Sequence, residues 1–177
     1  MEEVYKRLDE GIIERIRADI GSAAVVTDPE KLAVYGKDGT VAAFAMPELA
    51  VEAANTGQVQ ALLRLANRHR FPVIPRGLGT GLAGGAVPVR GGVVLSLARM
   101  NRIVAIETEN MIAQVEPGVL NKDFKEAVRA FGLYYPPDPA SYDTCSLGGN
   151  AATNAGGPSC VKYGVTRDYI LGLEAVL

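Results

Sequence analysis

The hydrophobic positions near the N-terminus recur every four residues, a spacing typical of one face of a helix. The stripe consists of Val4, Leu8, Ile12, Ile16 and Ile20, and Gly21 follows it as a stop signal. After a short apolar run at 23–26, Asp28 and Pro29 suit the start of a second helix over 29–35. Residues 36–48 are expected to form a connector.

Residues 49–74 combine two short apolar runs with one helical stripe. The runs at 49–53 and 71–74 predict strands, and Thr56 precedes a helix between them. We expect the apolar face of this helix to consist of Val59, Leu62, Leu63 and Ala66. The order strand, helix, strand favours two parallel strands joined by a crossover helix.

Three further apolar runs, at 93–97, 103–107 and 112–116, predict strands that lie close together and antiparallel. A helix is expected over 120–132, closed by Gly132. The last run, 169–177, is apolar at nearly every position and predicts a strand buried on both faces. The predicted fold class is therefore α+β, with two small sheets.

Composition excludes several classes of protein. The chain has 177 residues, 48% of them hydrophobic, and a formal charge of −2 without a basic block, which argues against a nucleic-acid surface. The N-terminal residues have no apolar core of a secretory signal. The longest uncharged run, 144–161, is too polar for a transmembrane segment. We therefore expect a cytoplasmic protein.

The cysteines and the single histidine offer little chemistry. Cys145 and Cys160 have no metal-ligand spacing, and two free thiols are favoured over a disulfide. His69 sits near the C-terminus of a predicted helix, where a cation interacts favourably with the helix dipole. No acid or nucleophile clusters beside it, so a capping role is favoured over catalysis.

The stretch 75–86, PRGLGTGLAGGA, concentrates five glycines in twelve residues. Gly79, Gly81 and Gly84 fit G-x-G-x-x-G, but that dinucleotide motif needs a helix that begins in the loop. Pro88 and two further glycines prevent one here, and a strand follows. A Walker loop is excluded because no Gly-Lys-Ser/Thr occurs.

Two interpretations of this glycine loop remain. It can be a wide hairpin turn, or an anion nest in which consecutive N–H groups surround a phosphate and Arg76 adds charge. In the second interpretation an anion occupies the space beside Gly79, so that a side chain there would prevent binding and leave the fold intact.

A second stretch favours the nest. Residues 136–157, PPDPASYDTCSLGGNAATNAGG, offer many hydroxyl and amide groups among small residues, namely Ser141, Thr144, Ser146, Asn150, Thr153 and Asn154. Two glycine-rich loops with many hydrogen-bonding groups predict one extended, phosphate-bearing ligand.

Several motifs now occur in the order seen in FAD-linked oxidases: PRGLGTGLAGGAVP, LSLARMNRI, VEPGV, YYPPDPAS, SLGGNAATNAGG and KYGVTRDYILGLEAVL. The chain resembles the FAD-binding domain of the vanillyl-alcohol oxidase/p-cresol methylhydroxylase (PCMH) superfamily, in the branch of the glycolate oxidase FAD subunit and D-lactate dehydrogenase. The resemblance covers residues 35–177, after an N-terminal helical segment at 1–34.

The resemblance implies two small α/β lobes with FAD between them. Cofactor contacts are implied in the first loop for Pro75, Arg76, Gly77, Leu78, Gly79, Thr80, Gly81 and Leu82. In the second stretch they are implied for Asp138, Pro139, Ala140, Ser141, Thr144, Cys145, Ser146, Gly148, Gly149, Thr153, Asn154, Ala155 and Gly156. Thr80 stands where relatives with covalent flavin carry histidine, so non-covalent FAD is implied. Cys145 is expected to be a small packed thiol.

The activity implied is oxidation of a 2-hydroxy acid such as glycolate or D-lactate. The substrate-cap domain of such enzymes is absent and the FAD domain is incomplete at its C-terminal end, so no catalytic residue is assigned. An iron–sulfur or electron-transfer subunit is implied as a partner, through which the protein could lie peripheral to a membrane. Without its neighbouring strand and the cap, the apolar run 169–177 is expected to stay uncovered, which predicts a homodimer. The alternative is a truncated, non-catalytic module that self-associates and does not retain flavin.

Overall fold

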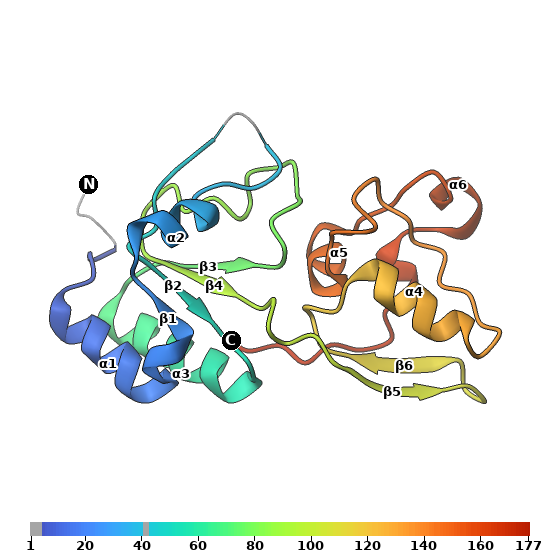
Figure 1. Cartoon of the computed structure of the whole chain (residues 1–177), viewed down its shortest axis with the longest axis horizontal. Coiled ribbons are helices and arrows are strands. Elements are labelled where there is room, and N and C mark those ends of the chain that lie inside the picture. Colours follow the sequence, from blue (N-terminus) through green and yellow to red (C-terminus); the bar gives the residue numbers. More distant parts are fainter. Residues whose placement is uncertain (1–4, 41–42) are drawn as a thin grey trace. The chain divides into compact units, whose positions relative to one another are not determined.

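A computed structural model describes residues 5–40 and 43–177. The chain divides into two compact units, residues 1–99 with 175–177 and residues 100–174. Figure 1 shows a sheet with flanking helices in the first unit and a hairpin with short helices in the second. The mixed α and β content agrees with the predicted fold class. Val4, the first residue of the predicted N-terminal stripe, lies outside the described residues.

The sheet of the first unit has four strands in the order β1-β2-β4-β3. They are β1 (Val25–Val26), β2 (Leu49–Glu52), β4 (Val93–Ser96) and β3 (Val73–Arg76). Both β2 and β3 run parallel to β4, while β1 is antiparallel to β2. The parallel direction of β2 and β3 is confirmed, although β4 lies between them.

The prediction that the strand at 93–97 joins the following antiparallel strands is therefore wrong. All four residues of β4 are buried, as expected for a central strand covered on both faces. Proximity along the chain suggested the wrong partner, because such a strand is stabilised by burial between two neighbours rather than by a hairpin.

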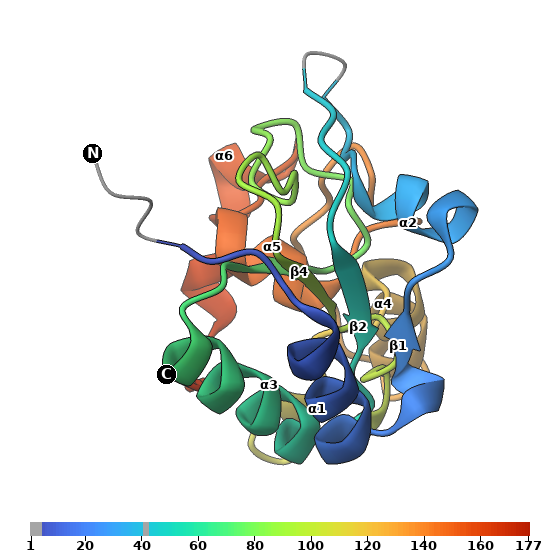
Figure 2. The ribbon, with the colours of Figure 1, turned by 90° about the vertical axis from the view of Figure 1, so that its left-hand side faces the viewer.

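Helices cover both faces of this sheet. Figures 1 and 2 show α1 (Glu10–Ile20) and α3 (Thr56–His69) packed side by side, while α2 (Pro29–Tyr35) lies on the other side of the sheet. On the α2 side, Leu32 packs against Ala50 of β2 and Val94 of β4. Ala50 and Val94 are register partners, so their side chains lie on the same face of the sheet.

The helix boundaries follow capping side chains. Asp9 accepts a hydrogen bond from the Ile12 N–H at 2.8 Å, so α1 begins at Glu10 and not near residue 4. Asn55 caps α3, which ends at His69 as predicted. On α3 the buried residues are Val59, Leu62, Leu65 and Ala66, so Leu65 takes the place predicted for Leu63.

The second unit consists of a hairpin and short helices. Strands β5 (Ile103–Glu107) and β6 (Ile112–Val115) pair antiparallel, as predicted. Helix α4 (Asn121–Arg129) packs its Phe124 and Val128 into a core with Val119 and Leu147. Helices α5 (Leu147–Thr153) and α6 (Cys160–Tyr163) and two 3-10 turns, Ser22–Ala24 in the first unit and Thr166–Tyr169 here, complete the described elements.

The predicted strand at 169–177 does not form. Residues 170–177 carry no strand, and Leu171, Leu173 and Leu177 have exposed fractions of 81%, 76% and 104%. A strand needs a neighbour to satisfy its N–H and C=O groups, and no described strand pairs with this segment. An apolar composition alone is therefore not enough to predict a strand.

The described residues contain no helix long and apolar enough to cross a membrane. Cys145 is buried and Cys160 partly buried, and both are free thiols, as predicted.

Candidate functional site

The glycine loop follows β3 at the carboxyl end of the parallel strands, the edge where α/β sheets bind ligands. In the part of the chain that the structure describes, the N–H groups of residues 77–82 donate to no protein acceptor. Leu82 is 79% exposed, and a Cβ added to Gly81 would meet nothing within 4 Å. The loop thus presents free donors to open space, as an anion nest requires.

The side chain of Arg76 does not extend into this space. Arg76 is buried, and its guanidinium donates to the carbonyl oxygens of Lys37 at 2.5 Å and Val34 at 3.3 Å. A Cβ added to Gly79, whose φ is +72°, would overlap this guanidinium. The Arg76 guanidinium therefore fills the space beside Gly79, and the prediction that an anion fills it is wrong.

Arg76 belongs to a polar row across the strand ends. Glu52, Ser96 and Arg76 are register partners on β2, β4 and β3. The Tyr35 hydroxyl donates to Glu52 Oε1 at 2.5 Å, and the Arg76 guanidinium lies 5.8 Å from the centre of the Tyr35 ring. Burial and the neighbouring Glu52 raise the pKa of Tyr35 to about 12, while burial lowers the pKa of Arg76. The row is a bonded framework beneath the glycine loop.

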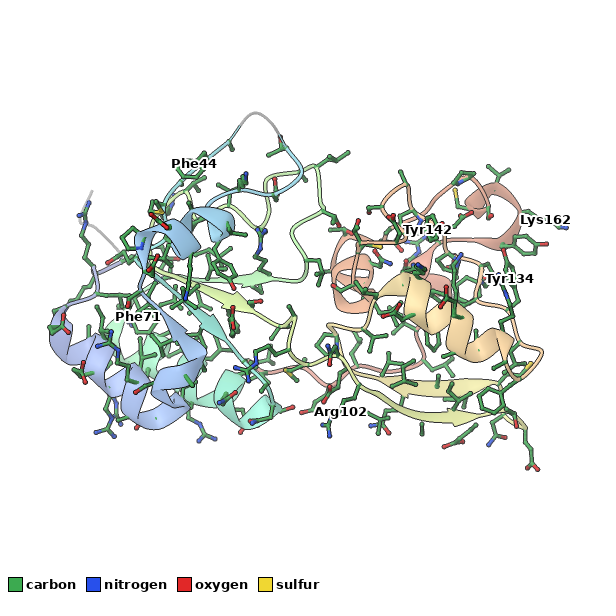
Figure 3. The ribbon with its side chains drawn as sticks, viewed as in Figure 1. Phe44, Phe71, Arg102, Tyr134, Tyr142 and Lys162 are labelled. Atoms are coloured by element: carbon green, nitrogen blue, oxygen red, sulfur yellow. The ribbon has the colours of Figure 1, made fainter. Side chains whose placement is uncertain are left out.

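The second predicted stretch lies in the second unit, and it begins with a tight turn. Asp138 accepts hydrogen bonds from the N–H (3.2 Å) and the hydroxyl (2.8 Å) of Ser159. The carbonyl of Pro139 accepts from the Tyr142 N–H at 2.8 Å, with exposed Ala140 between them. Tyr142, labelled in Figure 3, is itself exposed. This turn is held largely by its own groups.

Most of the hydroxyl and amide groups predicted as ligand contacts bond to protein instead. Ser146 caps α5 through the Gly149 N–H, and Thr153 donates to the Gly149 carbonyl at 3.0 Å. Thr144 donates to the Ser141 carbonyl at 3.3 Å, and Asn154 accepts from the Arg167 N–H at 3.0 Å. The density of such groups is thus explained in large part by a short helix, α5, that the sequence analysis did not predict.

Three other residues of this stretch bond to neighbouring segments through their backbone, and a fourth, Gly156, lies against a side chain. The Cys145 carbonyl accepts from the Asn121 N–H at 3.0 Å, and the Ala155 carbonyl accepts from both donors of Thr166. The Gly148 N–H donates to the Pro117 carbonyl at 2.8 Å. A Cβ on Gly156 would lie 3.3 Å from Val165.

Two buried amides are left with an unpaired atom. Asn150 Nδ2 and Asn121 Oδ1 have no hydrogen-bond partner, although the two side chains are 3% and 0% exposed. The side-chain amide nitrogen of Asn121, Nδ2, donates to the Pro137 carbonyl at 3.3 Å. An orphaned buried donor is costly and is often completed by a ligand or water. Asn150 was noted among the hydrogen-bonding groups of the second stretch but not among the implied cofactor contacts. Asn121 was missed because its position resembles an ordinary helix start.

The residues present fit a phosphate-bearing cofactor. Within the first unit, the free N–H groups at 77–82 and the open space at Gly81 suit oxygen acceptors. Within the second unit, the orphaned donor of Asn150 does so by itself. The individual cofactor contacts of both stretches stay predictions.

Comparison with known proteins agrees with this chemistry. A family described as FAD binding domain matches residues 47–177. The chain belongs to this family. This membership confirms two predictions, that the chain contains an FAD-binding domain and that FAD is the cofactor.

Among curated proteins, the chain is 46% identical over 144 residues to the glycolate oxidase subunit GlcD of Bacillus subtilis, covering 81% of the chain and 31% of that protein. It is 39% identical over 180 residues to the D-lactate dehydrogenase of Anaerostipes hadrus, covering 98% of the chain and 36% of that protein. The chain thus spans about a third of the length of these relatives.

Solved structures confirm the PCMH-type fold. Alkyldihydroxyacetonephosphate synthase superimposes with a TM-score of 0.83 at 21% identity, over 95% of this chain and 33% of its own. A p-cresol methylhydroxylase superimposes with a TM-score of 0.73 at 28% identity, over 86% of this chain and 31% of its own.

Proposed function

We propose that residues 35–177 form the FAD-binding portion of an oxidoreductase that oxidises a 2-hydroxy acid of the glycolate or D-lactate type. The observation that carries the proposal is the run of free N–H groups at 77–82 in a domain of the FAD-binding family. The substrate class rests on the names of the curated relatives, which include a glycolate oxidase subunit and a D-lactate dehydrogenase.

In this proposal the chain binds and orients the cofactor. The glycine loop holds the pyrophosphate through its backbone N–H groups. When bound, the flavin supplies the redox chemistry by accepting a hydride from the hydroxy acid. Thr80 offers no histidyl nitrogen for a covalent bond, which supports non-covalent binding.

No catalytic residue is proposed within this chain. Among residues 5–40 and 43–177, no three His, Cys, Asp or Glu side chains cluster as metal ligands would. We propose that catalysis requires a further region of the whole protein, since the chain spans about a third of the length of these relatives.

Partners and location are part of the same proposal. The printed name of the B. subtilis relative describes a subunit, which supports an electron-transfer or iron–sulfur partner. The exposed leucines after the Thr166–Tyr169 turn support homodimer formation. We propose a cytoplasmic protein that reaches a membrane through its partner.

Purification after incubation with FAD tests the proposal. We expect flavin absorbance in the protein fraction, released to the supernatant by acid precipitation. Reduction of a dye by glycolate or D-lactate should be undetectable with this chain alone. Flavin left in the washed pellet would refute non-covalent binding. A colourless protein after incubation would favour the alternative of a module that retains no flavin.

A further inference from the structure

The turn at 37–39 lies against the back of the glycine loop, outside the residues that the FAD-binding family matches. The Gly39 N–H donates to the Gly81 carbonyl at 2.8 Å. A Cβ added to Gly39 would lie 2.7 Å from the Thr80 carbonyl oxygen and 2.9 Å from that of Gly81. Only glycine permits this approach, so Gly39 is required by contact and not by an unusual φ.

This contact fixes the direction of the loop's donors. In a planar trans peptide the N–H of one residue points opposite to the C=O of the residue before it. Holding the carbonyls of Thr80 and Gly81 against Gly39 therefore turns the N–H groups of Gly81 and Leu82 away from the turn. Those N–H groups have no protein partner in the described chain.

Arg76 joins the loop to the same turn from a second point. Its guanidinium donates to Val34 at the end of α2 and to Lys37 in the turn. The backbone of Gly79 covers that guanidinium so closely that no side chain fits between them. Arg76 thus ties the middle of the loop to backbone that precedes it by about forty residues.

We propose that Arg76 and Gly39 are positioning residues, which hold the carbonyls of the loop inward so that its N–H groups are free for the pyrophosphate of FAD. This inference rests on the proposed function, and it extends the cofactor site to a turn that contacts no cofactor itself. The guanidinium, although cationic, acts through the backbone rather than on the phosphate, because it is buried and donates from both terminal nitrogens to the carbonyls of Lys37 and Val34.

Four variants of the full chain test the inference: Gly39→Ala, Arg76→Gln, Arg76→Lys and, as the control, Gly172→Ala. Gly172 lies outside both predicted cofactor stretches and a Cβ on it meets nothing within 4 Å, so the FAD affinity of this control should equal that of the wild type. Gly39→Ala and Arg76→Gln should each weaken FAD binding at least about tenfold, because the loop must shift. Should Gly39→Ala not fold, Arg76→Gln and Arg76→Lys decide the result.

The salt dependence of the FAD dissociation constant separates positioning from direct charge. A phosphate contact by Arg76 would be screened by salt, so its loss in Arg76→Gln would flatten the dependence. We expect the dependence of wild type and Arg76→Gln to be the same, with Arg76→Lys as weak a binder as Arg76→Gln. A flattened dependence, or rescue by lysine, would overturn the inference.

Trypsin provides a measurement that needs no flavin. The bond after Arg76 should be cleaved slowly in the wild type, because the guanidinium is buried, and faster in Gly39→Ala. Cleavage at that bond is followed by mass spectrometry. Equal cleavage rates, or equal FAD affinity of Gly39→Ala and wild type, would refute the positioning role. A wild type that binds no FAD but shows the expected cleavage pattern would refute the proposed function alone.

Discussion

Gly148, the second residue of α5, lies directly against Pro117. A Cβ on Gly148 would come 2.5 Å from the Pro117 Cβ and 2.9 Å from its carbonyl oxygen. The Gly148 N–H donates to that carbonyl at 2.8 Å. The contact joins α5 to the segment after β6, next to the core residues Val119 and Leu147.

Gly148→Ala should therefore destabilise the second unit. Overpacking against a backbone that cannot move freely costs roughly 1–3 kcal/mol in the free energy of unfolding. Urea denaturation of the flavin-free chain measures it. Gly172→Ala is the matched control, since its Cβ meets nothing within 4 Å. Equal denaturation midpoints for the two variants would contradict the packing described.

We predict that ionisation of Tyr35 destabilises the folded protein at high pH. Its pKa is raised from 10 to about 12, first by burial and then by Glu52. The folded state favours the protonated phenol. Its contribution to the free energy of unfolding is therefore complete below pH 10 and is lost as the pH rises toward 12. A titration of tyrosinate absorbance should show late-ionising tyrosines.

The variant Tyr35→Phe should remove one of these late tyrosines. Tyr135, whose pKa burial also raises to about 12, should account for another, so Tyr135→Phe serves as the parallel variant. If Tyr35→Phe removed only absorbance that appears near pH 10, the buried contact with Glu52 would be disproved.

We predict that the chain self-associates through Leu171 and Leu173. Both side chains are more than three-quarters exposed on a segment without a strand partner among the described elements. Grouped apolar side chains in water favour association, most simply as a two-fold dimer. Replacing both leucines by aspartate should shift the chain toward monomer in sedimentation analysis.

Val161→Asp is the control for that experiment, because Val161 is 96% exposed but lies on α6. It should leave association unchanged. A wild-type chain that sediments as a monomer at micromolar concentration, or an unchanged dimer in the double variant, would contradict this prediction.

Local patterns predicted the elements that depend on local chemistry. The capped helix α3 and the hairpin of β5 and β6 follow from periodicity and turn residues, and both are present. The position of β4 and the absence of a strand at 170–177 depend on which segments meet in space. No pattern within a single run contains that information.

The candidate site shows the same division. The glycine loop was found from its composition, but the reasons for its glycines differ. Gly79 accommodates Arg76, whereas Gly81 faces open space. Gly39, outside the loop in the turn at 37–39, accommodates the Thr80 carbonyl. The motif alone predicts close approach at each position, whereas only the structure shows what approaches.

The most direct test of FAD binding by the glycine loop is an FAD titration of Gly81→Val beside the wild type, with thermal unfolding of both flavin-free proteins. A side chain at Gly81 enters open space without touching protein, unlike one at Gly79. We predict an unchanged unfolding temperature and an FAD affinity at least about tenfold weaker, equivalent to ~1.4 kcal/mol of binding free energy. Equal FAD affinity of the two proteins would contradict the assignment of the loop to the cofactor.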